Sequence, residues 1–232
     1  MAVELHGVSA VLLPGTGSDD DYAYRAFGPA LRSAGAVPLP HAPQPARLVD
    51  GYVDALEQAS RDTPIIAAGI SLGAAVAAAW AITHPHRVVA VLAALPAWTG
   101  APHHAPAAAA ALHSAAELRR DGLVAATARM QASSPAWLAD ELTRSWVGQW
   151  PDLPTAMEAA SGYVAPTGPQ LATLAAPLAV AAATDDPVHP LEVGVEWVAA
   201  APRAALHTVT LAELGHDPSV LGTACLAALA DL

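Results

Sequence analysis

"GISLG", Gly69 to Gly73, is the stretch that decides how this chain of 232 residues folds. It stands between an apolar run of strand length, Pro64–Gly69, and an alanine-rich helical run, Leu72–Thr83. In that context G-x-S-x-G is typical of a sharp strand-to-helix turn, which strains the serine backbone and needs small residues two positions to either side. Ser71 is therefore a candidate nucleophile. The alternative is a glycine-rich connection whose serine only caps the helix.

Apolar runs alternate with helical segments on both sides of this turn. Strands of near-continuous apolar character are typical of a parallel sheet that is covered on both faces. The alternation predicts a doubly wound α/β domain with about six to seven mostly parallel strands. The predicted strands are Ser9–Leu13, Ala36–Leu39, Pro64–Gly69, Val88–Leu95, Leu178–Ala183 and Leu206–Leu211, and the predicted helices are Pro29–Ala34, Arg47–Arg61, Leu72–Thr83, Leu191–Ala200 and Pro218–Leu229.

The alternation breaks once, between Leu95 and Leu178, where helical material is interrupted by prolines. An insertion of this length between two strands is more often functional than a plain crossover. Asp140 and Arg144 lie four residues apart within it, which predicts an ion pair along one helix. We expect residues 1–95 and 172–232 to form the core, and residues 96–171 to form a helical cap.

Composition argues against several kinds of protein. The chain has 10 basic residues, all arginine, against 21 acidic ones, for a net charge of -11. Such a surface repels nucleic acid and anionic membranes, so neither is an expected partner. Ile65–Thr83 is uncharged and almost long enough to span a bilayer, but its change of character at Gly69 favours a strand followed by a helix.

The single cysteine, Cys225, cannot form an internal disulfide and suits a reducing compartment. The first residues, "MAVELHG", have neither the basic nor the apolar region of a signal peptide. We therefore expect a cytoplasmic protein. A homodimer is left open.

A nucleophilic serine needs a base, and the base needs an orienting acid. His216 follows the last predicted strand, in Gly215-His216-Asp217, where a histidine can swing back over the sheet edge; His41 is its main competitor. Asp185 and Asp186 follow the fifth predicted strand, and they cannot both point at the same imidazole.

In this order the residues resemble the α/β-hydrolase superfamily, from about Val11 to the C-terminus. The resemblance assigns Ser71 as nucleophile, Asp186 as acid and His216 as base. Asp186 is preferred over Asp185 because Pro190 completes the D-x-x-x-P pattern of the family. The run "GISLGAAVAAAWAITHPHRV" is similar to the family's nucleophile helix, and the helical insertion corresponds to a cap over the site.

The segment "LLPGTGSDDDYAY", Leu12–Tyr24, is then best interpreted as a backbone loop beside the nucleophile. It cannot be a Walker loop because the chain has no lysine, and consecutive aspartates point in different directions, which disfavours a metal site. The resemblance implies that the N–H groups of Thr16 and Leu72 form an oxyanion hole, although Pro14 replaces the histidine that is usual there. We expect the aspartates to cap the following helix.

These features predict an esterase- or lactonase-like serine hydrolase that cleaves a small carboxylic ester, lactone or thioester through an acyl-enzyme. Gly15, Trp98 and Trp146 are candidate substrate-binding residues, although the tryptophans suit packing of the cap equally well. Two alternatives stay open: a non-catalytic ligand-binding protein on the same fold, and a cofactor-free perhydrolase or carbon–carbon bond hydrolase with the same triad. No cofactor and no metal are expected.

Overall fold

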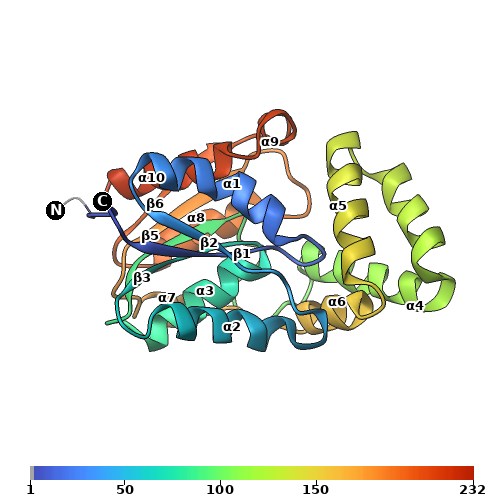
Figure 1. Cartoon of the computed structure of the whole chain (residues 1–232), viewed down its shortest axis with the longest axis horizontal. Coiled ribbons are helices and arrows are strands. Elements are labelled where there is room, and N and C mark those ends of the chain that lie inside the picture. Colours follow the sequence, from blue (N-terminus) through green and yellow to red (C-terminus); the bar gives the residue numbers. More distant parts are fainter. Residues whose placement is uncertain (1–2) are drawn as a thin grey trace.

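The computed structural model describes residues 3–232 and has a single six-stranded sheet at its centre. All neighbouring strands are parallel, in the order β2-β1-β3-β4-β5-β6. This is the predicted doubly wound α/β fold (Figure 1). The strands are β1 (Ser9–Leu13), β2 (Val37–Pro40), β3 (Ile65–Ile70), β4 (Val88–Ala94), β5 (Leu178–Ala183) and β6 (Ala204–Val209).

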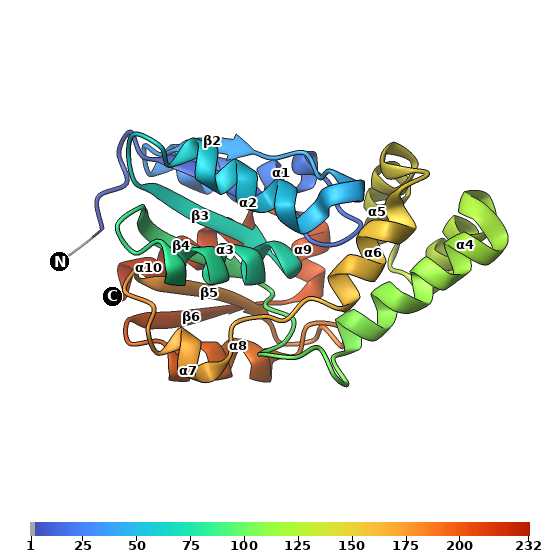
Figure 2. The same cartoon turned by 90° about the horizontal axis from the view of Figure 1, so that it is seen from below.

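The sheet is covered on both faces because its inner strands are apolar at every position. In β3, Ile65 and Ala67 belong to one core cluster, and Ile66 and Ala68 to the other. The first cluster packs under α2 (Leu48–Ala59), α3 (Leu72–Thr83), α7 (Gly168–Leu171) and α8 (Leu191–Ala200). The second packs under α1 (Asp20–Ser33), α9 (Leu211–His216) and α10 (Val220–Ala230), as the two layers of helices in Figures 1 and 2 show.

Helix α1 begins earlier than predicted, at Asp20 rather than Pro29. The side chain of Asp19 accepts a hydrogen bond from the N–H of Tyr22 and caps the helix, so the expected capping role of the aspartates holds for Asp19. The helix continues through Pro29, where a proline costs one backbone hydrogen bond. Burial of Phe27 and Leu31 on either side of the proline offsets that loss.

The segment after β6 also differs from the prediction. The strand ends at Val209, and the short helix α9 follows at once. Thr210 and Glu213 form a capping box at its start, in which each side chain accepts from the other residue's backbone N–H. His216, expected in the segment between the last predicted strand and the last predicted helix, therefore lies at the end of a helix.

A helical insertion lies between β4 and β5, at the end of the sheet where β1 and β3 finish (Figures 1 and 2). It contains α4 (Pro106–Ser133), α5 (Ala136–Gln149) and α6 (Leu153–Ser161), which we call the cap helices. Helix α4 is kinked at Gly122, whose φ is +77°. The cap has its own small core, formed by Ala115, Leu118, Ala126, Trp146, Leu153 and Met157.

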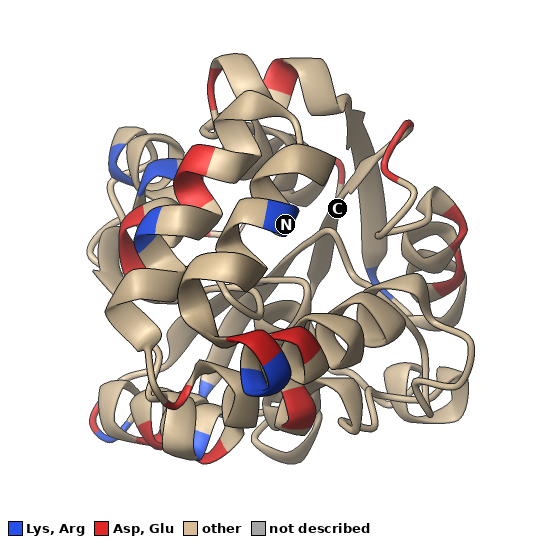
Figure 3. Cartoon of the chain, turned by 90° about the vertical axis from the view of Figure 1, so that its right-hand side faces the viewer, with Lys and Arg blue, Asp and Glu red and all other residues tan. Residues whose placement is uncertain are grey.

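Acidic residues outnumber arginines, 21 to 10, and both kinds lie on several of the helices (Figure 3). Arg144 of α5 pairs with Asp19, Asp21 and Glu141. The predicted pairing of Arg144 with Asp140 is therefore wrong, because the guanidinium lies between Asp19 and Asp21 of the core and Glu141 of its own helix. Among residues 3–232, no helix is both long and apolar enough to cross a membrane.

Candidate active site

Ser71 lies in a strained turn between β3 and α3. Its φ is +53° and its ψ is -113°, a backbone conformation that non-glycine residues rarely adopt. A Cβ atom on Gly69 would lie 2.2 Å from the backbone of Gly73, and one on Gly73 would lie 2.3 Å from the carbonyl oxygen of Leu13. Both flanking positions therefore require glycine, as the G-x-S-x-G pattern demands.

The side chain that meets Ser71 is His189, in the loop between β5 and α8. The His189 Nε2 atom is 3.0 Å from Ser71 Oγ, and its Nδ1 atom is 2.7 Å from Asp186 Oδ2. A carboxylate can only accept, so Nδ1 carries the proton and Nε2 is free to accept from the serine hydroxyl. The three side chains form one continuous relay, the arrangement that activates a serine as a nucleophile.

The environment of Asp186 keeps its carboxylate charged. Burial raises the pKa of this carboxyl group, but hydrogen bonds from the His189 ring and from the N–H groups of Val188 and His189 outweigh the burial and leave the pKa below its ordinary value. Asp185 points elsewhere and accepts from the N–H of Leu211. Asp186, not Asp185, therefore faces the imidazole.

The predicted base, His216, does not occupy the position beside Ser71. It is exposed at the C-terminal end of α9, while His189 takes the contact with the serine. The physical reason is local. The capping box after β6 starts a helix instead of an open loop, and Gly215 packs so closely against Trp137 of α5 that an added Cβ would lie 2.4 Å from the indole.

The loop between β1 and α1 passes directly beside Ser71. A Cβ on Gly15 would lie 3.4 Å from the Cβ of Ser71. The N–H of Ser18 donates to the carbonyl oxygen of Gly15 at 3.1 Å, and Gly17 has a φ of +72°, which is the pattern of a type II turn. Thr16 is the other central residue of this turn, and its N–H has no acceptor among residues 3–232.

Leu72 is the first residue of α3, where backbone N–H groups have no acceptor within the helix. Thr16 and Leu72 thus flank Ser71 with unused backbone donors. Their role as an oxyanion hole stays a prediction. Among residues 3–232, no group of three or more His, Cys, Asp and Glu side chains is arranged to hold a metal ion.

With this geometry in place, comparison with known proteins decides the family. The model of the alpha/beta hydrolase family matches residues 4–232. The chain belongs to the alpha/beta hydrolase family. A comparison with curated protein sequences finds no match.

Solved structures of alpha/beta hydrolase relatives share the fold of this chain. A hydrolase from Pseudomonas aeruginosa is 22% identical with a TM-score of 0.70, the match covering 96% of this chain and 90% of that one. An enol-lactonase from Burkholderia xenovorans is 17% identical with a TM-score of 0.64, over 89% and 83% of the two chains. An esterase from Thermogutta terrifontis is 15% identical with a TM-score of 0.65, over 89% and 82%. At these identities the likeness concerns the fold.

The two tryptophans that we predicted to bind substrate in this hydrolase are both buried. Trp98 follows β4, and its indole N–H donates to the carbonyl oxygen of Tyr163 at 3.1 Å. Trp146 belongs to the cap core, with its indole against Gly17 of the β1–α1 loop. Packing of the cap therefore accounts for both positions. Substrate binding by Gly15, Trp98 and Trp146 stays a prediction.

Sequence reasoning missed His189, although a signal for it was present. Asp186 and His189 stand three residues apart in "DDPVH", directly after a buried strand. Within one turn of chain, a histidine at that spacing can reach the carboxylate that precedes it, as the 2.7 Å contact demonstrates. In this member of the hydrolase family, the loop that holds Asp186 also holds the imidazole that contacts Ser71.

Proposed function

We propose that this chain is a serine hydrolase that cleaves a small carboxylic ester, lactone or thioester through an acyl-enzyme on Ser71. The observation that carries the proposal is the relay from Ser71 through His189 to Asp186, with contacts of 3.0 Å and 2.7 Å. The strained serine backbone and the family membership support it. The esterase and the enol-lactonase of the same fold are consistent with an ester or lactone substrate.

In the first half of the proposed reaction, the proton of the Ser71 hydroxyl passes to His189 Nε2 while Oγ attacks the substrate carbonyl carbon. Asp186 stabilises the imidazolium through its contact with Nδ1. The N–H groups of Thr16 and Leu72 bind the oxyanion of the tetrahedral intermediate, where one such donor contributes about 3 kcal/mol. When the intermediate collapses, His189 returns the proton to the leaving oxygen or sulfur and the acyl-enzyme forms.

In the second half, water takes the place of the alcohol or thiol. His189 Nε2 accepts a proton from the water as it attacks the acyl carbon, and then protonates Ser71 Oγ as the acid product leaves. No other reactant is required. The side chains involved are mostly buried, with 9% of the Ser71 surface and 18% of the His189 side chain exposed, so the reaction is shielded from bulk solvent.

The first test is hydrolysis of p-nitrophenyl esters of graded chain length by the wild type and by Ser71→Ala. We expect kcat to fall by about 10⁶-fold in the variant, because the nucleophile acts as a unit with its base. A fluorophosphonate probe should label the wild type rapidly and the variant not at all, since only an activated serine reacts. A wild-type protein that neither turns over nor labels would instead be a ligand-binding protein on this fold.

The second test asks which histidine is the base. We expect His189→Ala to lower kcat by several orders of magnitude, and His216→Ala to have a far smaller effect. Near-ultraviolet circular dichroism of both variants checks that they fold. If His216→Ala abolishes turnover while His189→Ala retains it, His216 is the base, as the family resemblance implied, and His189 only positions the acid.

Perhydrolysis or carbon–carbon bond hydrolysis would use the same relay, and the graded ester panel with added peroxide or a β-diketone distinguishes them.

The location in the cytoplasm and the homodimer stay predictions. Cys225 is fully buried, and burial raises the pKa of its thiol, which makes it unsuited to react on the surface.

A further inference from the structure

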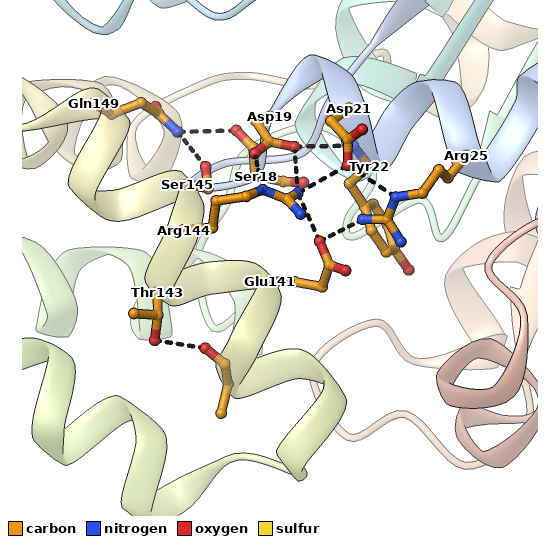
Figure 4. Close-up of polar contacts among 11 residues, drawn as sticks. Ser18, Asp19, Asp21, Tyr22, Arg25, Glu141, Thr143, Arg144, Ser145 and Gln149 are labelled. Carbon is orange, nitrogen blue, oxygen red and sulfur yellow. Dashed lines mark hydrogen bonds and ion pairs between the residues drawn. The ribbon is translucent and has the colours of Figure 1, made fainter.

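Cap helix α5 contacts the β1–α1 loop, residues 14–19, at three successive residues, and Figure 4 shows the contacts with Ser18 and Asp19. Gln149 Nε2 donates to the carbonyl oxygen of Ser18 at 2.9 Å. The indole of Trp146 lies against Gly17, where an added Cβ would be 3.0 Å from Nε1. Arg144 donates to both carboxylate oxygens of Asp19 at 3.0 and 3.1 Å. Three residues of one cap helix thus contact three successive residues of the loop.

The other end of this loop is held from the core. The hydroxyl of Tyr52, on α2, donates to the carbonyl oxygen of Pro14 at 3.0 Å, and the whole Tyr52 side chain is buried. Pro14 precedes the type II turn and Ser18 is its last residue, whose N–H donates to the carbonyl oxygen of Gly15. The free N–H of Thr16 therefore lies between an anchor on the core and an anchor on the cap.

The anchor on the cap combines two kinds of interaction. Gln149 is only 7% exposed, and its amide also donates to Ser145 at 2.7 Å, so its orientation is fixed. Arg144 is half exposed, and one such pair alone contributes about 0.2–1 kcal/mol. Here, however, the pair is part of a network: Glu141 accepts from Arg144 at 2.7 Å and from Arg25 of α1 at 2.5 Å.

Asp19 connects this network of charged side chains directly to the β1–α1 loop. The same Oδ1 atom that accepts from Arg144 also accepts from the N–H of Tyr22, so this carboxylate both caps α1 and binds the cap helix. A displacement of α5 would pull on the residue at which the loop becomes a helix. It would also remove the donor that restrains the Ser18 carbonyl group, two residues from the N–H of Thr16.

We propose that Gln149 and Arg144 are positioning residues for the oxyanion hole. By holding Ser18 and Asp19, they fix the direction of the Thr16 N–H, so that the loop is set for catalysis only while the cap is seated on the core. The inference rests on the proposed function for its catalytic meaning. Its structural part, a loop held by the cap, can be measured without any substrate.

The structural part is tested by hydrogen–deuterium exchange of peptides that cover residues 14–19. We expect exchange to increase about 10-fold or more in Gln149→Leu and in Arg144→Gln, because each loses a contact that restrains the loop. Arg119→Gln is the matched control. It removes a pair of comparable length, 2.5 and 2.7 Å to Glu158, which joins α4 to α6 inside the cap. Equal exchange in all three variants and the wild type overturns the proposal.

The catalytic part is tested by separating kcat from KM. A misdirected N–H group in the oxyanion hole weakens binding of the transition state more than binding of the substrate. We therefore expect kcat to fall about 10- to 100-fold while KM stays within about twofold of the wild-type value. Affinity for a boronic acid that forms a tetrahedral adduct on Ser71 should fall in parallel with kcat/KM. Arg144→Lys keeps the charge but loses the two-pronged contact, and should recover part of the loss.

The outcomes separate the two proposals. Suppose that exchange of residues 14–19 increases in the variants, but the wild type neither hydrolyses esters nor reacts with the fluorophosphonate probe. The proposed function then fails, while the anchoring of the loop by the cap stands. If the wild type is active, yet Gln149→Leu and Arg144→Gln match Arg119→Gln in kcat and boronic acid affinity, these residues do not position the oxyanion hole.

Discussion

Asp186 and His189 occupy one turn of chain, and each helps to hold the other. The Asp186 carboxylate accepts hydrogen bonds from the ring N–H of His189 and from the backbone N–H groups of Val188 and His189. Such local hydrogen bonding fixes the imidazole without help from a second loop. These hydrogen bonds also lower the pKa of Asp186 in the folded protein, which makes its ionisation a measurable property of the folded state.

At the residue scale we predict that Asp186→Asn lowers kcat by about 10⁴-fold, as loss of the orienting carboxylate does in a serine triad. The asparagine keeps the size of the side chain but not the charge that stabilises the imidazolium. Ester hydrolysis at pH 7, compared with the wild type, measures the loss. A variant that retains most of its kcat would remove Asp186 from the mechanism.

The same substitution has a pH-dependent effect on stability. The pKa of Asp186 is lowered in the folded protein, so the charged carboxyl stabilises the fold fully above its unfolded pKa of about 4, and this contribution is lost as the pH falls through the lower folded value. We expect the urea midpoint of the wild type to exceed that of Asp186→Asn at pH 7, and the gap to narrow near pH 3. A gap that is constant with pH would contradict this.

The residues of the candidate site were only partly predictable from sequence. Ser71 could be found because a strained turn imposes glycine on both sides of it, which leaves a visible pattern. Asp186 could be chosen over Asp185 from its spacing to Pro190. His189 could not be ranked above His216, since that choice depends on whether the segment after β6 coils into a helix, and on the contact between Gly215 and Trp137.

Among the elements, the buried strands were the most predictable. β1 and β5 match their predicted ranges, and so do α3 and α8, because apolar runs end at clear polar or proline boundaries. Helix α1 was predicted to start too late because Pro29 resembles a first helical residue. Helix α9 was missed, although Thr210 and Glu213 stand at the spacing of a capping box.

At the element scale we predict opposite effects for two glycine substitutions. Gly73→Ala would place a methyl group 2.3 and 2.8 Å from the carbonyl oxygens of Leu13 and Pro14, which are backbone atoms, so we expect a loss of at least about 1–3 kcal/mol in the free energy of unfolding. Gly148→Ala, in α5, meets nothing within 4 Å and should stabilise the helix by up to about 1 kcal/mol.

Urea denaturation of the two variants beside the wild type checks this pair. The two substitutions add the same methyl group, so differences in composition cancel between them. Equal midpoints for Gly73→Ala and Gly148→Ala would mean that α3 does not pack against the end of β1 as closely as described.

At the scale of the whole molecule, charge connects the cap to the core. Asp19, Asp21 and Arg25 on one side meet Glu141 and Arg144 on the other, and most of these side chains are partly exposed. Exposed pairs weaken as salt screens them, with a screening length of about 3 Å at 1 M. The position of the cap should therefore depend on ionic strength.

We predict that raising sodium chloride from low concentration to 1 M increases exchange of residues 14–19 and lowers kcat in the wild type. Arg144→Gln has already lost the pairs with Asp19, Asp21 and Glu141, so its exchange and kcat should change much less over the same range. The difference between the two salt responses is the measurement. Identical responses would show that the network does not control the loop.

The compact turn that carries both Asp186 and His189 has one more consequence. If those two residues complete the relay, then the residues beyond Val209 take no part in the chemistry; they cover one face of the sheet and, at Gly215, pack against Trp137 of α5. Substitutions there, including at His216, should be tolerated as long as α10 keeps its apolar contacts with that face and Gly215 keeps its contact with Trp137. Evolution could then remodel the end of such a chain, or join another domain to it, without loss of activity.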